Sequence, residues 1–298
     1  MFTYDSIAAL VSAADAGTKK ISELVLRDQA EQMGESEAAL YRRMDDDFTV
    51  MCDAVIYGQD KNQRSMSGLT GGEGYKMKQY ADRTQGGLSG LFMAHAMSRA
   101  LAVSGCNASM GKIVATPTAG SCGILPGCLV SLYEEKRFSR EAIVMSLFTA
   151  GAFGMVIAQT ACIAGAAGGC QAECGSAAGM AAAAFVELSG GTPQQCADAC
   201  AIALANQLGL VCDPVAGLVE IPCIKRNVAG TVIAFSAADM ALAGIASEIP
   251  VDECITAMNE VGQALPSALR ETALGGLAAT PTAQRLKERV FGKNPAGQ

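Results

Sequence analysis

The sequence predicts an all-α fold: a single helical domain whose long irregular loops converge on one site. Half of the 298 residues are apolar, yet aromatic residues make up only 5% and tryptophan is absent. The core must therefore be built from Ala, Gly, Leu, Val, Ile and Met, and small side chains of this kind let helices pack closely. The alternation of apolar and polar residues that is typical of strands is short wherever it occurs.

Hydrophobic periodicity and end signals place the helices in order. Two helices with charged faces begin the chain, and Ser36 before Glu37 is a favourable helix start for the second. A further helix begins near Pro126, and Thr192-Pro193 starts another, because proline suits a first helical turn. The predicted helical ranges are about 6–32, 36–57, 87–103, 126 onward, 139–165, 175–188, 192–208, 228–247 and 251–265, followed by a basic helix at the tail.

Three irregular segments interrupt this pattern, at 58–74, 115–125 and 206–227. Long loops inside an otherwise helical chain are usually functional. No repeat, charge run or Pro/Ser-rich linker divides the chain. We therefore expect residues 1–298 to form one domain, with 1–60 as peripheral helices and 61–298 as the core that carries the site.

Charge and composition exclude several classes of protein. A net charge of −7 and a pI near 4.9 argue against a nucleic-acid-binding protein, which needs clustered Lys and Arg. No charged residue lies between Glu141 and Glu173, a length that would span a bilayer. The stretch is rich in Gly and Ala and lacks basic or aromatic anchors at both ends, so we expect a buried core helix and no membrane span.

The cysteines indicate where the chain resides. The first residues, MFTYDSIAAL, lack the basic and apolar regions of a secretory signal. Twelve cysteines in a protein that is not exported indicate a reducing compartment, so we expect a cytoplasmic protein with free thiols. Six of these cysteines are expected to be small buried apolar residues. They are Cys52, Cys106, Cys162, Cys196, Cys200 and Cys254.

Three other cysteines stand at sharp turns of the backbone. Cys170 follows two glycines, Cys212 opens a Cys-Asp-Pro sequence, and Cys223 follows a proline. Soft thiolates on short rigid segments are the ligands of iron–sulfur clusters, and three of them would leave one iron open to a substrate. Cys174, four residues after Cys170, is either a further ligand or a packed side chain. Spacing alone supports a metal site and buried free thiols equally.

Two of the loops contain further polar motifs. Thr116, Thr118 and Ser121 form a hydroxyl-rich turn ahead of a helix, which is either an anion-binding turn or an ordinary helix cap. The glycine-rich loop with Ser67 and the nearby Lys76 lacks the GK[ST] ending of a phosphate loop, so we interpret it as a loop that covers a substrate.

The single histidine, His95, lies in an apolar helical stretch. A histidine in such a position is more typically a hydrogen-bonded core residue than a catalytic base. One histidine excludes histidine-rich zinc sites, and no GxSxG motif supports a serine hydrolase.

Four segments together resemble the alpha subunit of iron–sulfur-dependent L-serine dehydratase. They are ATPTAGSCGILP at 115–126, GCQAE at 169–173, CDPVAGLVEIPCIKRN at 212–227 and ETALGGLA at 271–278. The long third segment is the specific one. The chain departs from the family pattern at Cys174, where the family often has Val, and at Ala119, where it often has Asn.

The resemblance implies a largely helical fold and a [4Fe–4S] cluster on three cysteines, which match Cys170, Cys212 and Cys223. It implies deamination of L-serine to pyruvate and ammonia without pyridoxal phosphate, and a separate beta subunit as partner. The open iron would polarise the substrate hydroxyl while a base removes the α-proton.

Roles for the remaining residues follow from the same resemblance. Thr116, Thr118 and Ser121 would contact the substrate carboxylate or amine, and Ser67 and Lys76 would be catalytic residues from the covering loop. The base is unassigned; it is His95 or a residue of a partner chain. Two alternatives remain open at this point: a cluster-dependent cysteine desulfidase, and a non-catalytic helical assembly subunit.

Overall fold

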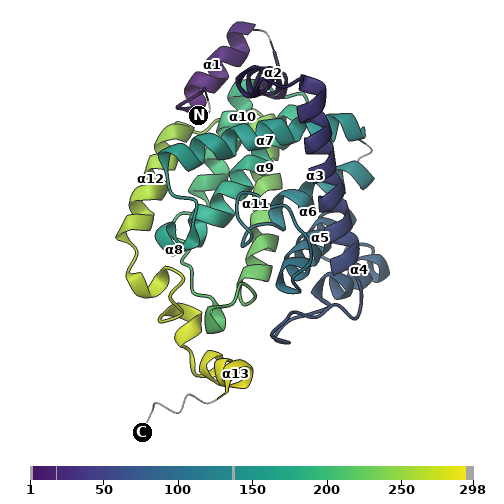
Figure 1. The fold of residues 1–298 in the computed structure, drawn as a ribbon, viewed down its shortest axis with the longest axis vertical. Coiled ribbons are helices and arrows are strands. Elements are labelled where there is room, and N and C mark those ends of the chain that lie inside the picture. The colour runs from purple at the N-terminus through teal and green to yellow at the C-terminus, as the bar shows by residue number, and fades with distance from the viewer. Residues whose placement is uncertain (1–2, 18, 136–137, 293–298) are drawn as a thin grey trace.

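The computed structural model describes residues 3–17, 19–135 and 138–292, and over these residues it contains helices and no strand. The predicted all-α single domain is confirmed (Figure 1). The helices are α1 (Ile7–Gly17), α2 (Ile21–Met33), α3 (Glu37–Gly58), α4 (Glu73–Thr84), α5 (Leu91–Ala108), α6 (Ile124–Glu135), α7 (Arg140–Thr160), α8 (Gly165–Gly168), α9 (Ser176–Leu188), α10 (Pro193–Ala205), α11 (Cys223–Leu242), α12 (Val251–Ala264) and α13 (Pro281–Phe291). Short helical turns are η1 (Gln171–Gly175), which is a π-helix, and the 3-10 turns η2 (Val215–Gly217), η3 (Ser267–Leu269) and η4 (Gly276–Ala279).

Helix α9 forms the centre of the core. Its sequence, SAAGMAAAAFVEL, is almost entirely buried because it packs against α7, α10 and α11. The run of alanines and Gly179 allows this close packing: a Cβ at Gly179 would lie 2.8 Å from the sulfur of Cys200 on α10. The small side chains noted in the composition therefore serve the innermost helix.

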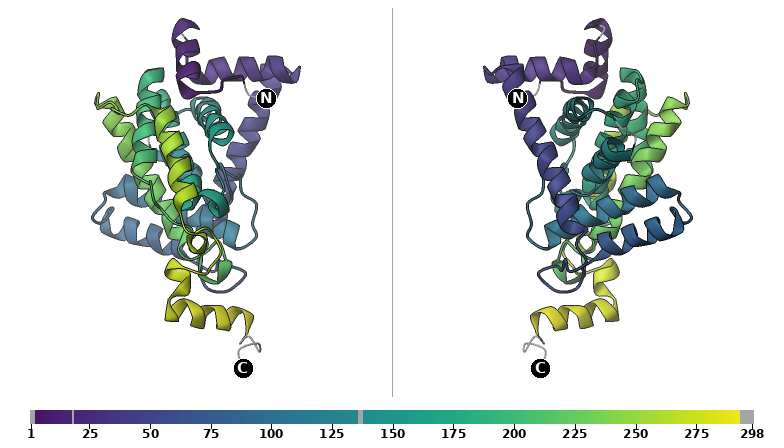
Figure 2. Two further views of the ribbon diagram at one scale, coloured as in Figure 1. Left: turned by 90° about the vertical axis from the view of Figure 1, so that its left-hand side faces the viewer. Right: turned by 90° about the vertical axis from the view of Figure 1, so that its right-hand side faces the viewer.

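The N-terminal segment differs from the sequence prediction. We expected one helix over 6–32, but the structure contains two, α1 and α2. Lys20 has an extended backbone, with φ −67° and ψ 149°, and α2 begins directly after it. The helix predicted from Ser36 is confirmed, and the Ser36 hydroxyl accepts a hydrogen bond from the backbone N–H of Ala39. Figure 2 shows α1 and α2 at one end of the molecule and α13 at the other.

Helix α7 is long and apolar enough to cross a membrane by length and composition. However, 67% of its most apolar window is buried inside the protein, where it packs against α2 and α9. This burial is what the sequence led us to expect for a core helix.

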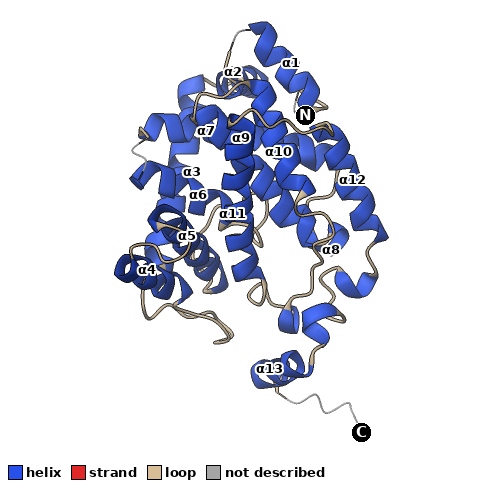
Figure 3. Ribbon diagram, turned by 180° about the vertical axis from the view of Figure 1, so that it is seen from behind, coloured by secondary structure: helices blue, strands red, loops and turns tan. Residues whose placement is uncertain are grey.

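The loops that carry the motifs lie in the half of the molecule toward α13 (Figure 3). The irregular segment after α10 is shorter than predicted, because α11 begins at Cys223 and not near Val228. Pro222 stands at the N-cap position, so that Cys223 is the first helical residue. Helix α4, which the sequence analysis left out, begins directly after Gly72, a residue with φ +73°.

Close contact of α3 with α5 depends on Gly58, and this yields a stability test. A Cβ at Gly58 would lie 1.8 Å from the carbonyl oxygen of Ala102, so Gly58→Ala forces the two helices apart. We expect a loss of ~3 kcal/mol in the free energy of unfolding, measured by urea denaturation. In Gly151→Ala, inside α7, the added Cβ meets nothing within 4 Å. This control should be neutral or gain up to ~1 kcal/mol. Equal stability of the two variants would contradict the packing.

Candidate metal centre

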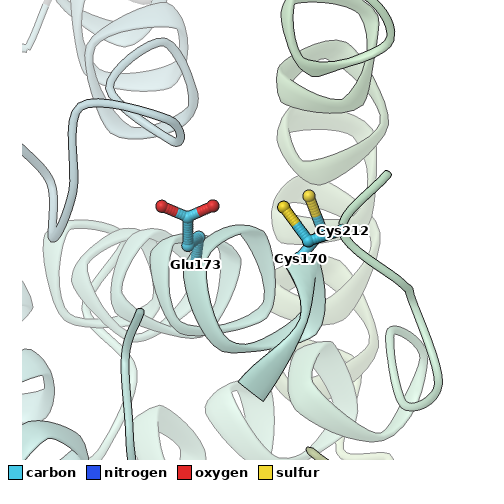
Figure 4. Close-up of side chains that lie close together, drawn as sticks. All are labelled: Cys170, Glu173 and Cys212. Atoms are coloured by element: carbon cyan, nitrogen blue, oxygen red, sulfur yellow. The ribbon is translucent and has the colours of Figure 1, made fainter. Parts of the chain in front are cut away.

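Two cysteines and a carboxylate come together where the loops converge. The ligand atoms of Cys170, Glu173 and Cys212 all lie within 4.8 Å of one another. Figure 4 shows the two sulfur atoms side by side and the Glu173 carboxylate directed to the same side of the chain. Cys170 precedes η1, whereas Cys212 comes from the irregular segment after α10, so the tertiary fold brings them together.

The position of Cys170 is fixed by its two neighbours. Gly169 has φ +78°, and a Cβ there would lie 2.7 Å from Leu265 Cδ1 and 2.9 Å from the Leu210 carbonyl oxygen, so that only glycine fits. The buried side chain of Gln171 donates hydrogen bonds to the carbonyl oxygens of Gly168 and Met258, at 3.0 and 2.8 Å. The Gln171 amide oxygen accepts from the Gly209 N–H at 2.8 Å.

Cys212 is held by the segment after α12. Its N–H donates to the Leu269 carbonyl oxygen at 2.8 Å, and its own carbonyl oxygen accepts from the Glu271 N–H at 2.7 Å. This short parallel bridge between Cys212 and Arg270 joins two segments that are far apart in the sequence. The ETALGGLA motif noted in the sequence therefore supports a cysteine of the centre.

Cys223 lies outside the 4.8 Å group but in the same electrostatic environment. Burial, and then the negative charge of Cys170, raise the pKa of the Cys223 thiol to about 12. One turn later on α11, Asn227 donates hydrogen bonds to the carbonyl oxygens of Cys223 and Gly120, at 2.9 and 2.8 Å, and accepts from the Gly123 N–H at 2.8 Å. Asn227 thus ties the hydroxyl-rich turn to the helix that carries Cys223.

Among these thiols, the surroundings of Cys170 favour loss of its proton. Hydrogen bonds from Cys174 and Cys212 lower the pKa of the Cys170 thiol well below the ordinary thiol value, and the nearby Arg226 adds to this effect. The same hydrogen bonds and burial raise the pKa of Cys174 and of Cys212 well above the ordinary thiol value. In the metal-free protein these opposite shifts favour ionisation of Cys170 over ionisation of the two thiols that donate to it.

Glu173 provides the one carboxylate of the group. Its Oε1 accepts a hydrogen bond from the Thr118 hydroxyl at 2.7 Å. Burial is the largest cause that raises the pKa of Glu173 to about 7, although the Thr118 bond acts in the opposite direction. The Glu173 carboxyl therefore titrates near neutral pH.

Glycines leave room around these groups. A Cβ at Gly165 would lie 2.7 Å from Glu173 Oε2 and 3.1 Å from the sulfur of Cys212, and a Cβ at Gly120 would lie 2.9 Å from Glu173 Oε1. Buried soft sulfur donors with a nearby arginine suit an iron–sulfur cluster, whose net charge is negative. The residues present therefore fit the group that the sequence analysis expected.

The other residues singled out from the sequence have distinct surroundings. Ser121 lies with its hydroxyl 3.2 Å from that of Thr118, beside Glu173, whereas the buried Thr116 hydroxyl has no hydrogen-bond partner among the described residues. Ser67 accepts a hydrogen bond from the Leu69 N–H within its own loop, and Lys76 is exposed on α4. His95 lies between the carboxylates of Asp82 and Glu135, at 2.8 and 2.9 Å.

Three charged residues were quoted within the motifs but given no role. The Glu173 carboxylate lies in the same cluster of side chains as the Cys170 and Cys212 sulfur atoms. Arg226 contacts the sulfur of Cys170 and forms an ion pair with Asp213. All three flank cysteines in a part of the sequence with few charges, and a buried charge needs a partner. A charged residue close to a cysteine in this weakly charged part of the sequence was therefore the signal that could have identified these three residues.

The fold and the site together define a helical protein with a buried group of thiols and a carboxylate, compatible with a metal, between its loops. The family model described as serine dehydratase alpha chain matches residues 16–278, so the chain belongs to that family.

Curated relatives agree with this family. The chain is 53% identical to the "Probable L-serine dehydratase, alpha chain" of Bacillus subtilis, over 91% of this chain and 90% of the relative. It is 44% identical to the "L-serine dehydratase, alpha chain" of Peptoniphilus asaccharolyticus, over 90% of this chain and 91% of that protein. The "L-serine dehydratase" of Streptomyces coelicolor is 42% identical, but the match covers only 44% of that longer protein.

The pKa of Glu173 predicts a pH dependence of stability for the metal-free protein. An acid whose pKa rises from 4.5 to about 7 on folding contributes stability that is complete below pH 4.5 and is lost as the pH rises through 7. Compared with Glu173→Gln, the wild-type apoprotein should lose ~2–3 kcal/mol between pH 5 and pH 8. Urea denaturation at both pH values measures this difference. A constant difference between the two proteins would show that the carboxyl does not titrate in this range.

Proposed function

We propose that this protein is a [4Fe–4S]-dependent lyase that deaminates L-serine to pyruvate and ammonia by elimination of water. The observation that carries the proposal is that Cys170 and Cys212, from separate segments, come together with Glu173 in a protein of the serine dehydratase alpha-chain family. The proposed substrate, L-serine, is inferred from relatives that are named L-serine dehydratase.

The three sulfur ligands of the cluster would be those of Cys170, Cys212 and Cys223. When bound, such a cluster supplies a Lewis acid that polarises the β-hydroxyl, which is otherwise a poor leaving group. The protein contributes ligands that are already positioned, since Gln171, Asn227 and the Cys212–Arg270 bridge fix their backbones.

The hydroxyl-rich turn would bind and orient the substrate. Thr118 and Ser121 lie beside Glu173, and the buried Thr116 hydroxyl is without a partner among the described residues, so it is available to a ligand. Elimination also needs an acceptor for the α-proton. Glu173 fits this role better than His95, because its carboxylate stands among the proposed ligands and has a pKa near neutrality, whereas both ring nitrogens of His95 already face carboxylates.

The loop over 58–72 would cover the bound substrate. Thr70 donates a hydrogen bond to Glu220 at 2.8 Å, and both side chains are buried. This contact ties the glycine-rich loop to the segment between Cys212 and Cys223. Ser67 and Lys76 remain our predictions for catalytic residues from this region.

The alpha-chain description of the family supports a beta subunit as partner. We also place the protein in the cytoplasm, because all twelve cysteines are free in the structure and a cluster with an open iron needs a reducing compartment.

The first prediction concerns a ligand. Cys212→Ala, reconstituted anaerobically with iron and sulfide, should lose the visible absorbance of the cluster together with serine deamination, because the remaining thiols leave a second iron unligated. Cys52→Ala, on α3 and partly exposed, is the matched control and should keep both. A Cys212→Ala protein that retained the absorbance and the deamination would refute the ligand assignment.

A second prediction concerns the substrate. Addition of L-serine to the anaerobic wild-type protein should shift the visible spectrum, because a substrate bound beside the cluster would change its absorbance, and pyruvate and ammonia should form in equal amounts. L-cysteine is the comparison. Release of sulfide from L-cysteine without ammonia from L-serine would identify a desulfidase, and a protein that binds neither iron nor sulfide would be an assembly subunit.

A further inference from the structure

We propose that Arg226 is a positioning residue of the metal centre, which holds Cys170 in place and links it to the C-terminal segment through Asp213. The inference rests on the proposed cluster, and it assigns a function to two charged residues that bind neither the cluster nor the substrate in that proposal. Its basis is a continuous series of polar contacts that runs from Leu277 to the sulfur of Cys170.

Arg226 uses both ends of its guanidinium group. Nη1 donates to the Cys170 sulfur at 3.4 Å and to the Val211 carbonyl oxygen at 2.8 Å. Nη2 lies 2.8 Å from Asp213 Oδ1. The Arg226 side chain is 15% exposed and that of Asp213 only 4%, so solvent screens this ion pair little.

The Asp213 carboxylate is also held through its second oxygen. Its second oxygen, Oδ2, accepts a hydrogen bond from the Leu277 N–H at 2.7 Å. A Cβ at Gly276 would lie 2.3 Å from that oxygen, and Gly276 has φ +57°, so glycine is required at this contact. With Oδ2 held by this hydrogen bond, Asp213 keeps Oδ1 against the guanidinium as an ion pair at 2.8 Å, and Oδ1 receives no hydrogen bond from the described residues.

The charges of these groups are complementary. The Asp213 carboxylate lies against Nη2 of Arg226, whereas Nη1 of the same cation faces the sulfur of Cys170. A planar guanidinium can serve a carboxylate, a carbonyl oxygen and a sulfur at once, which the single ammonium group of lysine does not reproduce. Groups that orient a metal ligand in this way commonly change metal affinity 10–100-fold when they are removed.

The arrangement makes the C-terminal segment part of the support of the metal centre. Leu277 lies in η4, which leads into α13, and α13 packs against η2 and η4 (Figure 1). A shift of this segment would act directly on Asp213 and, through Arg226, on the ligand Cys170. Cys212 is held by the preceding residues 269–271, so two of the three proposed ligands depend on the same end of the chain.

The test compares iron release from anaerobically reconstituted proteins. The rate at which a ferrous chelator removes iron is measured without substrate for the wild type, Arg226→Gln, Arg226→Lys and Asp213→Asn. Arg226→Gln should lose iron about ten-fold faster or more. Arg226→Lys should be intermediate, because it keeps the charge but not the planar group, and Asp213→Asn should also release iron faster because its arginine is no longer held.

Lys225→Gln is the matched control. It removes the same formal charge from the neighbouring position on α11, where the side chain is exposed, and should release iron at the wild-type rate. Far-ultraviolet circular dichroism establishes that each variant is folded. If Arg226→Gln does not fold, Arg226→Lys and Asp213→Asn decide the question by the same rate measurement.

The outcomes separate this inference from the proposed function. A wild-type protein that binds a cluster, with iron release from Arg226→Gln and Asp213→Asn within two-fold of wild type, overturns the role of Arg226 and leaves the lyase proposal intact. A wild-type protein that binds no iron and sulfide overturns the proposed cluster, and this inference with it.

Discussion

The candidate metal centre depends on the hydrogen bonds of one buried amide, that of Gln171. Its side chain joins the end of α8, the middle of α12 and the segment that leads to Cys212. The Gly168 carbonyl stands at the end of the short α8 and the Gly209 N–H belongs to irregular backbone, and such a group costs ~1–3 kcal/mol if it is buried without a partner. Gln171, next to Cys170, provides hydrogen-bond partners for these groups. This allows an irregular segment to pass through the helical core. Asn227 does the same for the hydroxyl-rich turn and the start of α11.

Small residues make this arrangement possible. Gly169 and Gly165 stand where a Cβ would meet either the neighbouring backbone or the ligand atoms themselves, and Gly58 stands where α3 meets α5. A composition rich in glycine and alanine is thus used in two ways in this protein. In the core it brings α9 and its neighbours close together, and at the site it leaves room beside sulfur and carboxylate atoms.

Burial and charge then decide the chemistry of the site. A carboxylate in this apolar setting resists ionisation, which is why the pKa of Glu173 lies near 7, whereas Cys170 becomes a thiolate because two thiols and a guanidinium stabilise it. One group that holds a proton near neutral pH and one that gives its proton up lie within 4.8 Å of each other. Such a difference between neighbouring titratable groups is typical of functional sites.

The sequence by itself determined the helical fold class, most helix positions and the cysteines at turns, because periodicity and end signals are local properties of the chain. It missed the break between α1 and α2 and placed the start of α11 near Val228, whereas α11 begins at Cys223, since backbone angles at Lys20 and Pro222 depend on what packs around them. Only the tertiary structure decided that Glu173, Arg226 and Asp213 belong to the site. Their partners lie on segments remote in sequence, and no local pattern encodes a contact between Leu277 and Asp213 or between Arg226 and Cys170.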